Sequence, residues 1–207
     1  NIVQEFDISS EKFAEQFSLL YEVNSDKIES LALYGNEGRL IASEPVAVEK
    51  ENIDVTGQDW YKNAESANEN VHFSIPHIQN LYEDGLYRYH WVVSLSRYVD
   101  INDGEIPGSG VLLVDMKYSV IEDVLKQIND SSEGIYYYMI SRDGQMIYHP
   151  RKTEMARGLF EENSLKASGY EEGTYEITTD GHKESLVVGN IAYTGWKLIG
   201  VVPESVQ

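Results

Sequence analysis

The sequence predicts an α+β fold: a long N-terminal helix followed by two tandem subdomains, each an antiparallel sheet flanked by helices. The chain has 207 residues, enough for one large domain or two small ones. Apolar residues recur with helical spacing in two segments and alternate in many shorter ones. The order hairpin, short helical insert, Asp-Gly hairpin and terminal strand occurs twice, and the turn residues Gly38 and Gly144 lie 106 residues apart.

The first half begins with an expected helical stalk over residues 1–30. Its apolar residues Phe6, Phe13, Phe17 and Leu20 fall on one helical stripe. A short helix is expected from Asp59, and a capping box, Ser119 to Glu122, opens another. The expected strands are 31–34, 39–42, 71–79, 86–98 and 111–115.

The second half repeats this pattern after a polar break at 129–134. Its expected strands are 136–140, 145–149, 174–179, 182–190 and 196–202, with an Asp-Gly turn at 180–181. We therefore expect a stalk at 1–30, a first subdomain with the ligand pocket at 31–130, a second at 131–203 and the start of an exit helix at 204–207.

Composition excludes several classes of protein. There are 16 basic and 35 acidic side chains, a net charge of −19, which argues against binding nucleic acid or anionic lipid. A hydrophobic content of 42% excludes intrinsic disorder, and the absence of cysteine excludes disulfides and thiolate metal sites. No apolar run reaches the ~18–20 residues of a transmembrane helix, and the start at Asn1 predicts a mature or excised fragment.

Residues able to perform catalysis or bind a metal do not form a recognisable motif. The chain lacks a G-x-S-x-G elbow and a phosphate-binding Gly-Lys-Ser/Thr loop. His72 and His77 lie five residues apart, so on a strand they point to opposite faces. We expect no cofactor, no metal and no enzymatic activity in this fragment.

Three groups of side chains are candidates for a binding pocket. Trp60 and Tyr61 could form its wall, or simply pack in the core. His77 and Gln79 share a strand face and could form its floor, or belong to an edge strand that faces solvent. Asp115 follows four apolar residues and could point into the pocket, or cap the following helix.

Three segments carry a resemblance to a known family. Residues 58–64, Gln-Asp-Trp-Tyr-Lys-Asn-Ala, are similar to an Arg-x-Trp-Tyr-x-x-Ala element, and residues 74–79 and 110–115 are similar to the strands that accompany it. Over nearly its whole length the chain resembles the double Cache (dCache) family of bacterial extracytoplasmic sensor domains, built of two PAS-like halves. The resemblance implies a ligand site in the membrane-distal half, lined by Gln58, Trp60, Tyr61, His77, Gln79 and Asp115.

The same resemblance implies a membrane-bound receptor, most like the sensor histidine kinases paired with AraC-type regulators. A methyl-accepting chemoreceptor is the alternative, and a cell-surface carbohydrate-binding or adhesion module is the alternative from another class. In the full-length receptor the domain is expected to be an extracellular homodimer, attached to the membrane only through flanking helices. The membrane-proximal half is expected to be a structural relay.

Two departures from the family pattern bear on the ligand. Gln58 stands where amino-acid-binding members carry arginine, and His77 and Gln79 stand where they carry a tyrosine and an acid, whereas Asp115 is kept. Because Gln58 cannot form a bidentate ion pair with a carboxylate, an ordinary amino acid is expected to be an unlikely ligand. A polar small molecule, such as a sugar, a small peptide or a nucleobase-like ring, is expected instead.

Overall fold

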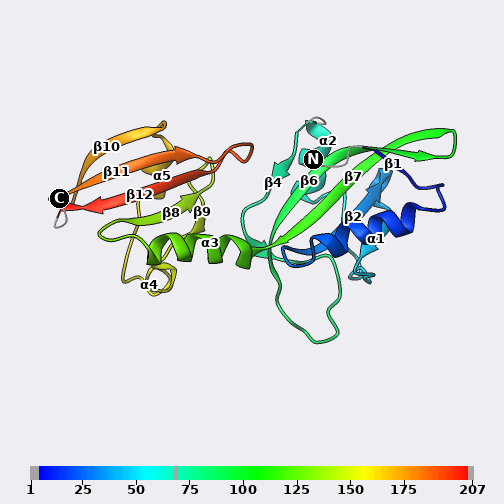
Figure 1. The fold of residues 1–207 in the computed structure, drawn as a ribbon, viewed down its shortest axis with the longest axis horizontal. Helices are drawn as coiled ribbons and strands as arrows, with labels where there is room; N and C mark the ends of the chain where they lie inside the picture. The colour runs from blue at the N-terminus through cyan, green and yellow to red at the C-terminus, as the bar shows by residue number, and fades with distance from the viewer. Residues whose placement is uncertain (1–4, 68–69, 205–207) are drawn as a thin grey trace. The chain divides into compact units, whose positions relative to one another are not determined.

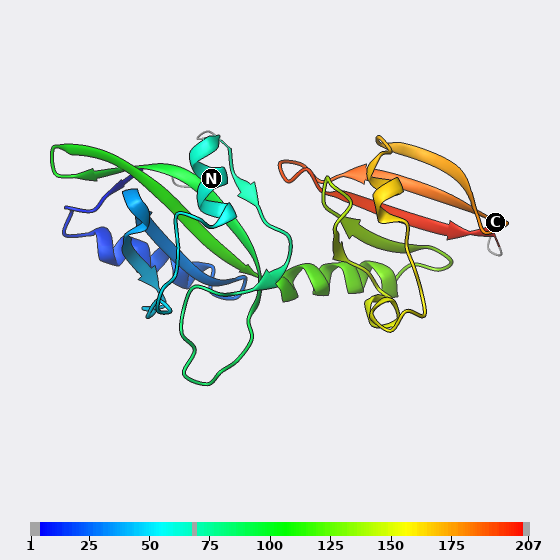
Figure 2. The same cartoon turned by 180° about the vertical axis from the view of Figure 1, so that it is seen from behind.

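The computed structural model describes residues 5–67 and 70–204, which divide into two compact units at Tyr118/Ser119. Figures 1 and 2 show that each unit has its own sheet and its own helices. The predicted α+β fold with two sheets is therefore confirmed. In the described part of the chain, no helix is both long and apolar enough to cross a membrane.

The first unit is built around a seven-stranded sheet with the main order β1-β6-β7-β2-β3. The short strands β4 and β5 also pair with β6, and β1 pairs with β6 in parallel, whereas the other pairs are antiparallel. The elements are β1 (Glu5–Asp7), α1 (Phe13–Val23), β2 (Ile28–Gly35), a 3-10 turn η1 (Asn36–Gly38), β3 (Leu40–Glu44), α2 (Asp59–Ser66), β4 (His72–Phe73), β5 (His77–Ile78), β6 (Trp91–Asp103) and β7 (Ile106–Lys117).

Each face of this sheet has its own apolar cluster, because side chains alternate along a strand. On one face Leu31, Leu33 and Leu112 pack with Phe17 of α1. On the other face lies a second cluster, which includes side chains of α2: Ala32, Tyr34, Trp60, Tyr61, Ala64, Val111 and Leu113. The sheet is thus covered by α1 on one side and α2 on the other (Figure 1).

The expected helical stalk over residues 1–30 is wrong in extent, since the helix covers only Phe13–Val23. Phe6 lies instead in strand β1, whose backbone pairs with residues 100–102 of β6. Asp7 ends this strand, because its carboxylate accepts bonds from the backbone N–H and hydroxyl of Ser9. The aromatic stripe still comes together, since the ring centroids of Phe6 and Phe17 lie 6.1 Å apart. Residues 1–4 lie outside the described residues.

The second predicted hairpin differs from the strands in the structure. Residues 71–79 form two short strands rather than one, with Pro76 in the break, where proline lacks the N–H that a strand ladder needs. Their partner β6 begins at Trp91, and residues 79–90 form a loop rather than a tight Asp-Gly turn. The strand expected at 111–115 is longer than predicted, because β7 covers Ile106–Lys117.

The close approach of β7 to β2 depends on a glycine. A Cβ atom on Gly110 would overlap the backbone carbonyl oxygen of Tyr34 and the Cδ1 of Ile101. We expect Gly110→Ala to lower the free energy of unfolding by about 1–3 kcal/mol, because the strands must separate to admit the methyl group. Urea unfolding would measure this. Gly85→Ala is the control, since a Cβ there meets nothing within 4 Å. Equal stabilities for the two variants would contradict the steric argument.

The second unit is a five-stranded antiparallel sheet of order β10-β11-β12-β8-β9. Its inner face packs Tyr138, Ile140, Leu186, Ile199 and Val201. The predicted strands 136–140 and 182–190 are confirmed at both ends. The exit helix expected at 204–207 lies outside the described residues apart from Glu204. The elements are α3 (Tyr118–Asp130), β8 (Tyr136–Ile140), β9 (Met146–Tyr148), α4 (Lys152–Ala156), α5 (Ser164–Ser168), β10 (Gly173–Thr179), β11 (His182–Asn190) and β12 (Lys197–Pro203).

Candidate ligand-binding site

Asp115 lies inside the first unit, on the central strand β7. It is two residues beyond Leu113, so its side chain faces the same side of the sheet as the α2 cluster. Its side chain is buried, with 2% exposure, and it sits inside the strand rather than at its end. The alternative that Asp115 caps the following helix is therefore wrong.

A hydrogen-bonded chain leads from Asp115 to β5. Ser94 is directly opposite Asp115 on β6, and its hydroxyl donates to Asp115 Oδ1 at 2.6 Å. His77 Nε2 lies 2.8 Å from the same Ser94 Oγ, and its Nδ1 lies 3.1 Å from the carbonyl oxygen of Ile78. Among the described hydrogen bonds, none engages the other carboxylate oxygen, Oδ2. The described bonds of the carboxylate therefore fall on Oδ1 alone.

Burial is the main influence on the ionisation of Asp115. Removal of the carboxyl group from water raises its pKa to about 6, although the bond from Ser94 and the proximity of His77 oppose the shift. The negative charge of Glu29 adds to it. Burial disfavours the charged form of Asp115, and a positively charged group brought close to the carboxylate would stabilise that form.

Two tyrosines border the same region. The hydroxyl oxygens of Tyr34 and Tyr82 lie 2.7 Å apart, and burial raises the pKa of both. The negative charges of Asp115 and Glu49 raise the pKa of both tyrosines further. Glu49 Oε1 is buried without a hydrogen-bond partner. The sequence prediction did not include Tyr34, Tyr82, Ser94 or Glu49.

The Trp-Tyr pair of α2 packs against this region. The ring of Trp60 lies 5.2 Å from that of Tyr34, and only 8% of Trp60 is exposed. Its backbone carbonyl accepts a bond from the Ser96 hydroxyl of β6, and the Tyr61 hydroxyl donates to the carbonyl of Gly35. Trp60 and Tyr61 therefore pack in the core, and their contact with a ligand stays a prediction.

Gln58 precedes the first residue of α2. Its carbonyl accepts the backbone N–H groups of Tyr61 and Lys62, which closes the first turn of the helix. Its side chain makes no capping bond to the helix and is half-buried. The predicted role of its amide in ligand binding stays a prediction.

Gln79 organises the loop over residues 79–90. Its Oε1 accepts the backbone N–H groups of Leu81 at 2.6 Å and Tyr82 at 2.7 Å, and its Nε2 donates to the Tyr82 carbonyl at 3.2 Å. The far end of the loop is held by His90, whose ring nitrogens lie 2.9 Å from Glu29 Oε1 and 2.6 Å from Asp84 Oδ2. Gln79 thus fixes Tyr82 next to Tyr34.

We expect Gln79→Ala to lower the free energy of unfolding by roughly 1–3 kcal/mol, because two backbone N–H groups lose their acceptor. Urea unfolding would measure the change. Gln145→Ala, at an exposed turn position, should stay within about 0.5 kcal/mol of the original chain. If the Gln79→Ala chain is as stable as this control, the hydrogen bonds of Gln79 contribute nothing to the free energy of unfolding.

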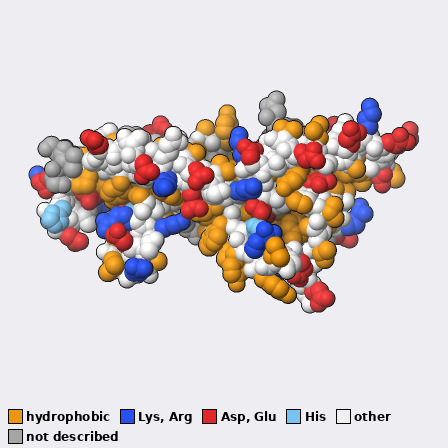
Figure 3. All heavy atoms as spheres, turned by 60° about the horizontal axis from the view of Figure 1, so that its bottom comes forward, with side chains coloured by type: hydrophobic (Ala, Val, Ile, Leu, Met, Phe, Trp, Pro, Cys, Tyr) orange, Lys and Arg blue, Asp and Glu red, His pale blue; other side chains and the backbone are white. Residues whose placement is uncertain are grey.

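The tip of this loop is apolar and exposed. Leu86, Tyr87 and Tyr89 are 72%, 90% and 80% exposed. Figure 3 shows hydrophobic side chains gathered on the lower part of the surface in that view. The start of the loop is therefore fixed next to Tyr82 by the hydrogen bonds of Gln79, whereas its tip is apolar and lies in solvent.

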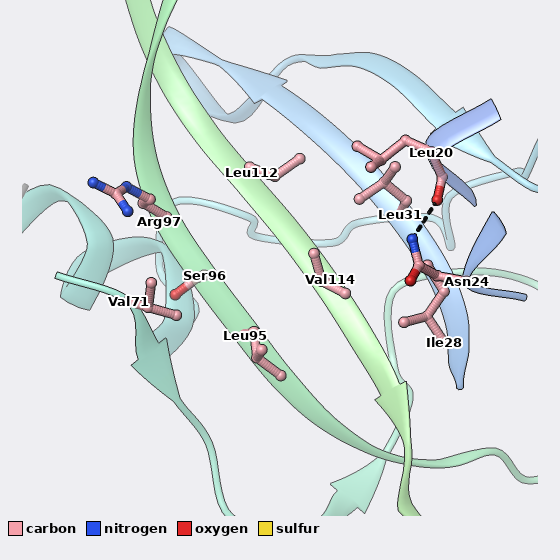
Figure 4. A pocket seen from close by; sticks show the side chains of 10 residues that line it. All are labelled: Leu20, Asn24, Ile28, Leu31, Val71, Leu95, Ser96, Arg97, Leu112 and Val114. Carbon is pink, nitrogen blue, oxygen red and sulfur yellow. Dashed lines mark hydrogen bonds between the residues drawn. The ribbon is translucent and has the colours of Figure 1, made fainter. Parts of the chain in front are cut away.

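A cavity of about 210 Å³ lies on the α1 side of the first unit (Figure 4). Its lining is mostly aliphatic and includes Leu20, Leu31 and Leu112, and the Asn24 amide in it donates to the Leu20 carbonyl. The guanidinium of Arg97 in Figure 4 points away from this aliphatic cluster. Because polar groups do not converge here, the α2 side with Asp115 is the better candidate site.

A family model for Cache domains, dCache_1, matches residues 1–206. The chain belongs to the dCache_1 family of Cache domains. The Cache domain is 24% identical to methyl-accepting chemotaxis protein McpA of Bacillus subtilis over 94% of this chain, and 26% identical to TlpB of the same organism over 72%. It spans 27% and 20% of the lengths of these curated relatives.

Solved structures share the fold at low identity. The ligand-binding domain of the Pseudomonas fluorescens chemoreceptor CtaA with L-alanine superposes with a TM-score of 0.65 at 18% identity, over 96% of this chain and 84% of that one. The domain of PctB from Pseudomonas aeruginosa PAO1 with L-arginine gives 0.62 at 19% identity, over 92% and 79%.

These structures overturn the expectation that an ordinary amino acid is an unlikely ligand. Domains of the same fold hold L-alanine and L-arginine. The expectation rested on Gln58 in place of arginine, but a carboxylate is also bound by backbone N–H groups and other neutral donors. The absence of one cation therefore does not exclude an amino acid.

Proposed function

We propose that this Cache domain is the extracytoplasmic sensory domain of a transmembrane chemoreceptor, and that its first unit binds an amino acid through the ligand's ammonium group. The observation that carries this proposal is the buried Asp115 carboxylate, with one oxygen held by Ser94 and the other outside the described hydrogen bonds. An ammonium group supplies a positive charge and further N–H donors to this carboxylate.

The comparisons support a chemoreceptor over the predicted histidine kinase. The curated relatives that match the chain are named methyl-accepting chemotaxis proteins, and the solved neighbours are chemoreceptor domains that hold amino acids. The adhesion-module alternative has no comparable support. Because the chain spans about a quarter of McpA, the output of the whole protein is part of the proposal.

We further propose that the domain acts by binding alone, without catalysis. Asp115 and Tyr82 are only 2% and 6% exposed, so a ligand reaches them only when part of the wall moves. The loop over residues 79–90 carries Tyr82 and is the segment we expect to move. A ligand that binds one arrangement of this loop more tightly than the other shifts the population between them, which is the signal.

The experiment is a calorimetric titration of the 207-residue chain with L-alanine, L-leucine, L-asparagine, L-arginine and GABA, each beside its N-acetylated form. We expect saturable binding of at least one free amine and none of its N-acetyl derivative, which has lost the ammonium charge. Equal binding of the two forms would contradict recognition through Asp115. No binding at ten-fold above a Kd of about 1 mM would contradict the amino-acid proposal.

A further inference from the structure

The second unit contains a cavity of its own, lined by aromatic rings and acids. Its volume is about 90 Å³, and its lining includes Tyr136, Tyr138, Phe160, Glu162 and Glu184. The rings of Tyr136 and Tyr138 come from β8, and Glu184 comes from β11 of the same sheet. Nothing in the sequence pattern predicted a site in this half.

Glu162 is a largely buried acid in this lining. Its side chain is 11% exposed. The Tyr136 hydroxyl donates to its Oε2 at 2.7 Å, and His149 Nε2 lies 2.9 Å from the same oxygen. Both described hydrogen bonds of the Glu162 carboxylate therefore involve Oε2. No hydrogen bond among those described involves Oε1.

The bond from His149 does not bring a positive charge. His149 Nδ1 accepts the backbone N–H of Arg151 at 2.9 Å, so this nitrogen carries no proton. The single ring proton must then lie on Nε2, where it is donated to Glu162, and the imidazole is neutral. Glu162 is thus held by two neutral donors, and its charge is not compensated by them.

Glu184 adds a second negative group to the same cavity. Burial and the charge of Glu162 raise the pKa of Glu184, which shows that the two carboxyl groups interact unfavourably. Lys166 lies at the rim and is exposed, and none of the ion pairs in the described part of the chain joins it to either acid. Two partly buried carboxyl groups that share one cavity repel each other, and a cation bound between them relieves that repulsion.

We propose that the second unit binds a small organic ammonium ion in this cavity, with its charge between Glu162 and Glu184 and its carbon groups against Tyr136 and Tyr138. Aromatic faces attract organic cations, and together with carboxylates they distinguish an alkylated ammonium ion from a bare metal ion. A cavity of about 90 Å³ holds the volume of roughly three waters, which limits the ligand to a methylated ammonium group or a short alkylamine.

The test is a calorimetric titration with methylammonium, ethylammonium and tetramethylammonium chloride at fixed ionic strength, with sodium and calcium chloride as reference salts. The Asp115→Asn chain is used, so that binding to the first unit is weakened, and all further variants are compared in this background. We expect one saturable site for at least one ammonium ion, and an affinity at least ~10-fold lower in the same chain with Glu184→Gln added. Glu176→Gln is the matched control, because Glu176 is an exposed residue of the neighbouring strand β10.

Glu184→Gln is preferred to Glu162→Gln because no described hydrogen bond involves the Glu184 side chain, whereas Glu162 accepts two. Circular dichroism confirms that each variant is folded. Tyrosine fluorescence provides a second readout, since a cation over Tyr136 and Tyr138 should change their emission. Absence of a saturable site overturns the proposal, as do equal losses in the Glu184→Gln and Glu176→Gln chains. Calcium binding as tight as ammonium binding would overturn the ligand class. None of these outcomes bears on Asp115 in the first unit.

Discussion

Replacing Asp115 by asparagine should weaken amino-acid binding by about 10–150-fold, the equivalent of the ~1.5–3 kcal/mol contributed by a hydrogen bond to a charged group. The shape of the side chain is kept, and the asparagine oxygen still accepts the Ser94 hydroxyl. What is lost is the negative charge at the centre of the sheet. Isothermal titration with the tightest amino acid of the panel would measure the loss.

The same substitution should stabilise the unliganded domain. The pKa of Asp115 is raised to about 6 in the folded state, against 3.8 for the ordinary group. The unfolded state therefore loses this proton first as pH rises, and stability falls between about pH 4 and pH 6. At pH 7.5 Asp115→Asn should be more stable than the original chain by roughly 1–3 kcal/mol, and this gain should vanish near pH 4.

Asp100→Asn is the matched control, because Asp100 is exposed on β6 and should leave both affinity and stability unchanged. If Asp115→Asn binds the amino acid as tightly as the original chain, the carboxylate is not the ligand's partner. If it instead unfolds the domain at pH 7.5, the buried charge is part of the fold.

Trp60→Ala should lower the free energy of unfolding by about 3–5 kcal/mol, the usual cost of removing a large buried aromatic side chain. The ring is buried between α2 and the sheet, in contact with the rings of Tyr34 and Tyr61. Its loss leaves a void at the level of the Tyr34–Tyr82 pair. Urea unfolding followed by far-ultraviolet circular dichroism is the measurement.

Trp91→Ala is the comparison for this variant, since Trp91 is 52% exposed and its removal should cost much less. Trp60→Phe should recover most of the stability, because a phenyl ring fills part of the same space. If Trp60→Ala is no less stable than Trp91→Ala, the core position of Trp60 is contradicted.

The sequence predicted the fold where local patterns decide it. The Asp-Gly turn at 180–181 and the strands beside it were located correctly, because turn chemistry and alternation act over a few residues. The stalk was predicted too long because the stripe containing Phe6 and Phe17 has helical spacing. Residues 5–7 form a strand because they pair with β6, almost a hundred positions further along the chain. A local sequence pattern cannot predict such a distant contact.

The candidate site was predictable only in part for the same reason. Asp115 could be found because a carboxyl group directly after four apolar residues is unusual. Tyr34 and Tyr82 could not, because they are 48 residues apart and meet only when the loop over residues 79–90 folds back. One sign was present: Tyr34 shares its strand face with Ala32, so period two placed it on the side of the sheet that faces α2.

The loop over residues 79–90 has a consequence for proteolysis. Chymotrypsin prefers large apolar and aromatic side chains, and Leu86, Tyr87 and Tyr89 present such side chains at an exposed tip, where backbone is most easily nicked. Gln79 holds the segment before the cut, and His90, in contact with Glu29 of β2, holds the segment after it. A single cut should therefore yield two fragments on a denaturing gel that still elute together as one folded species, with Tyr82 retained beside Tyr34.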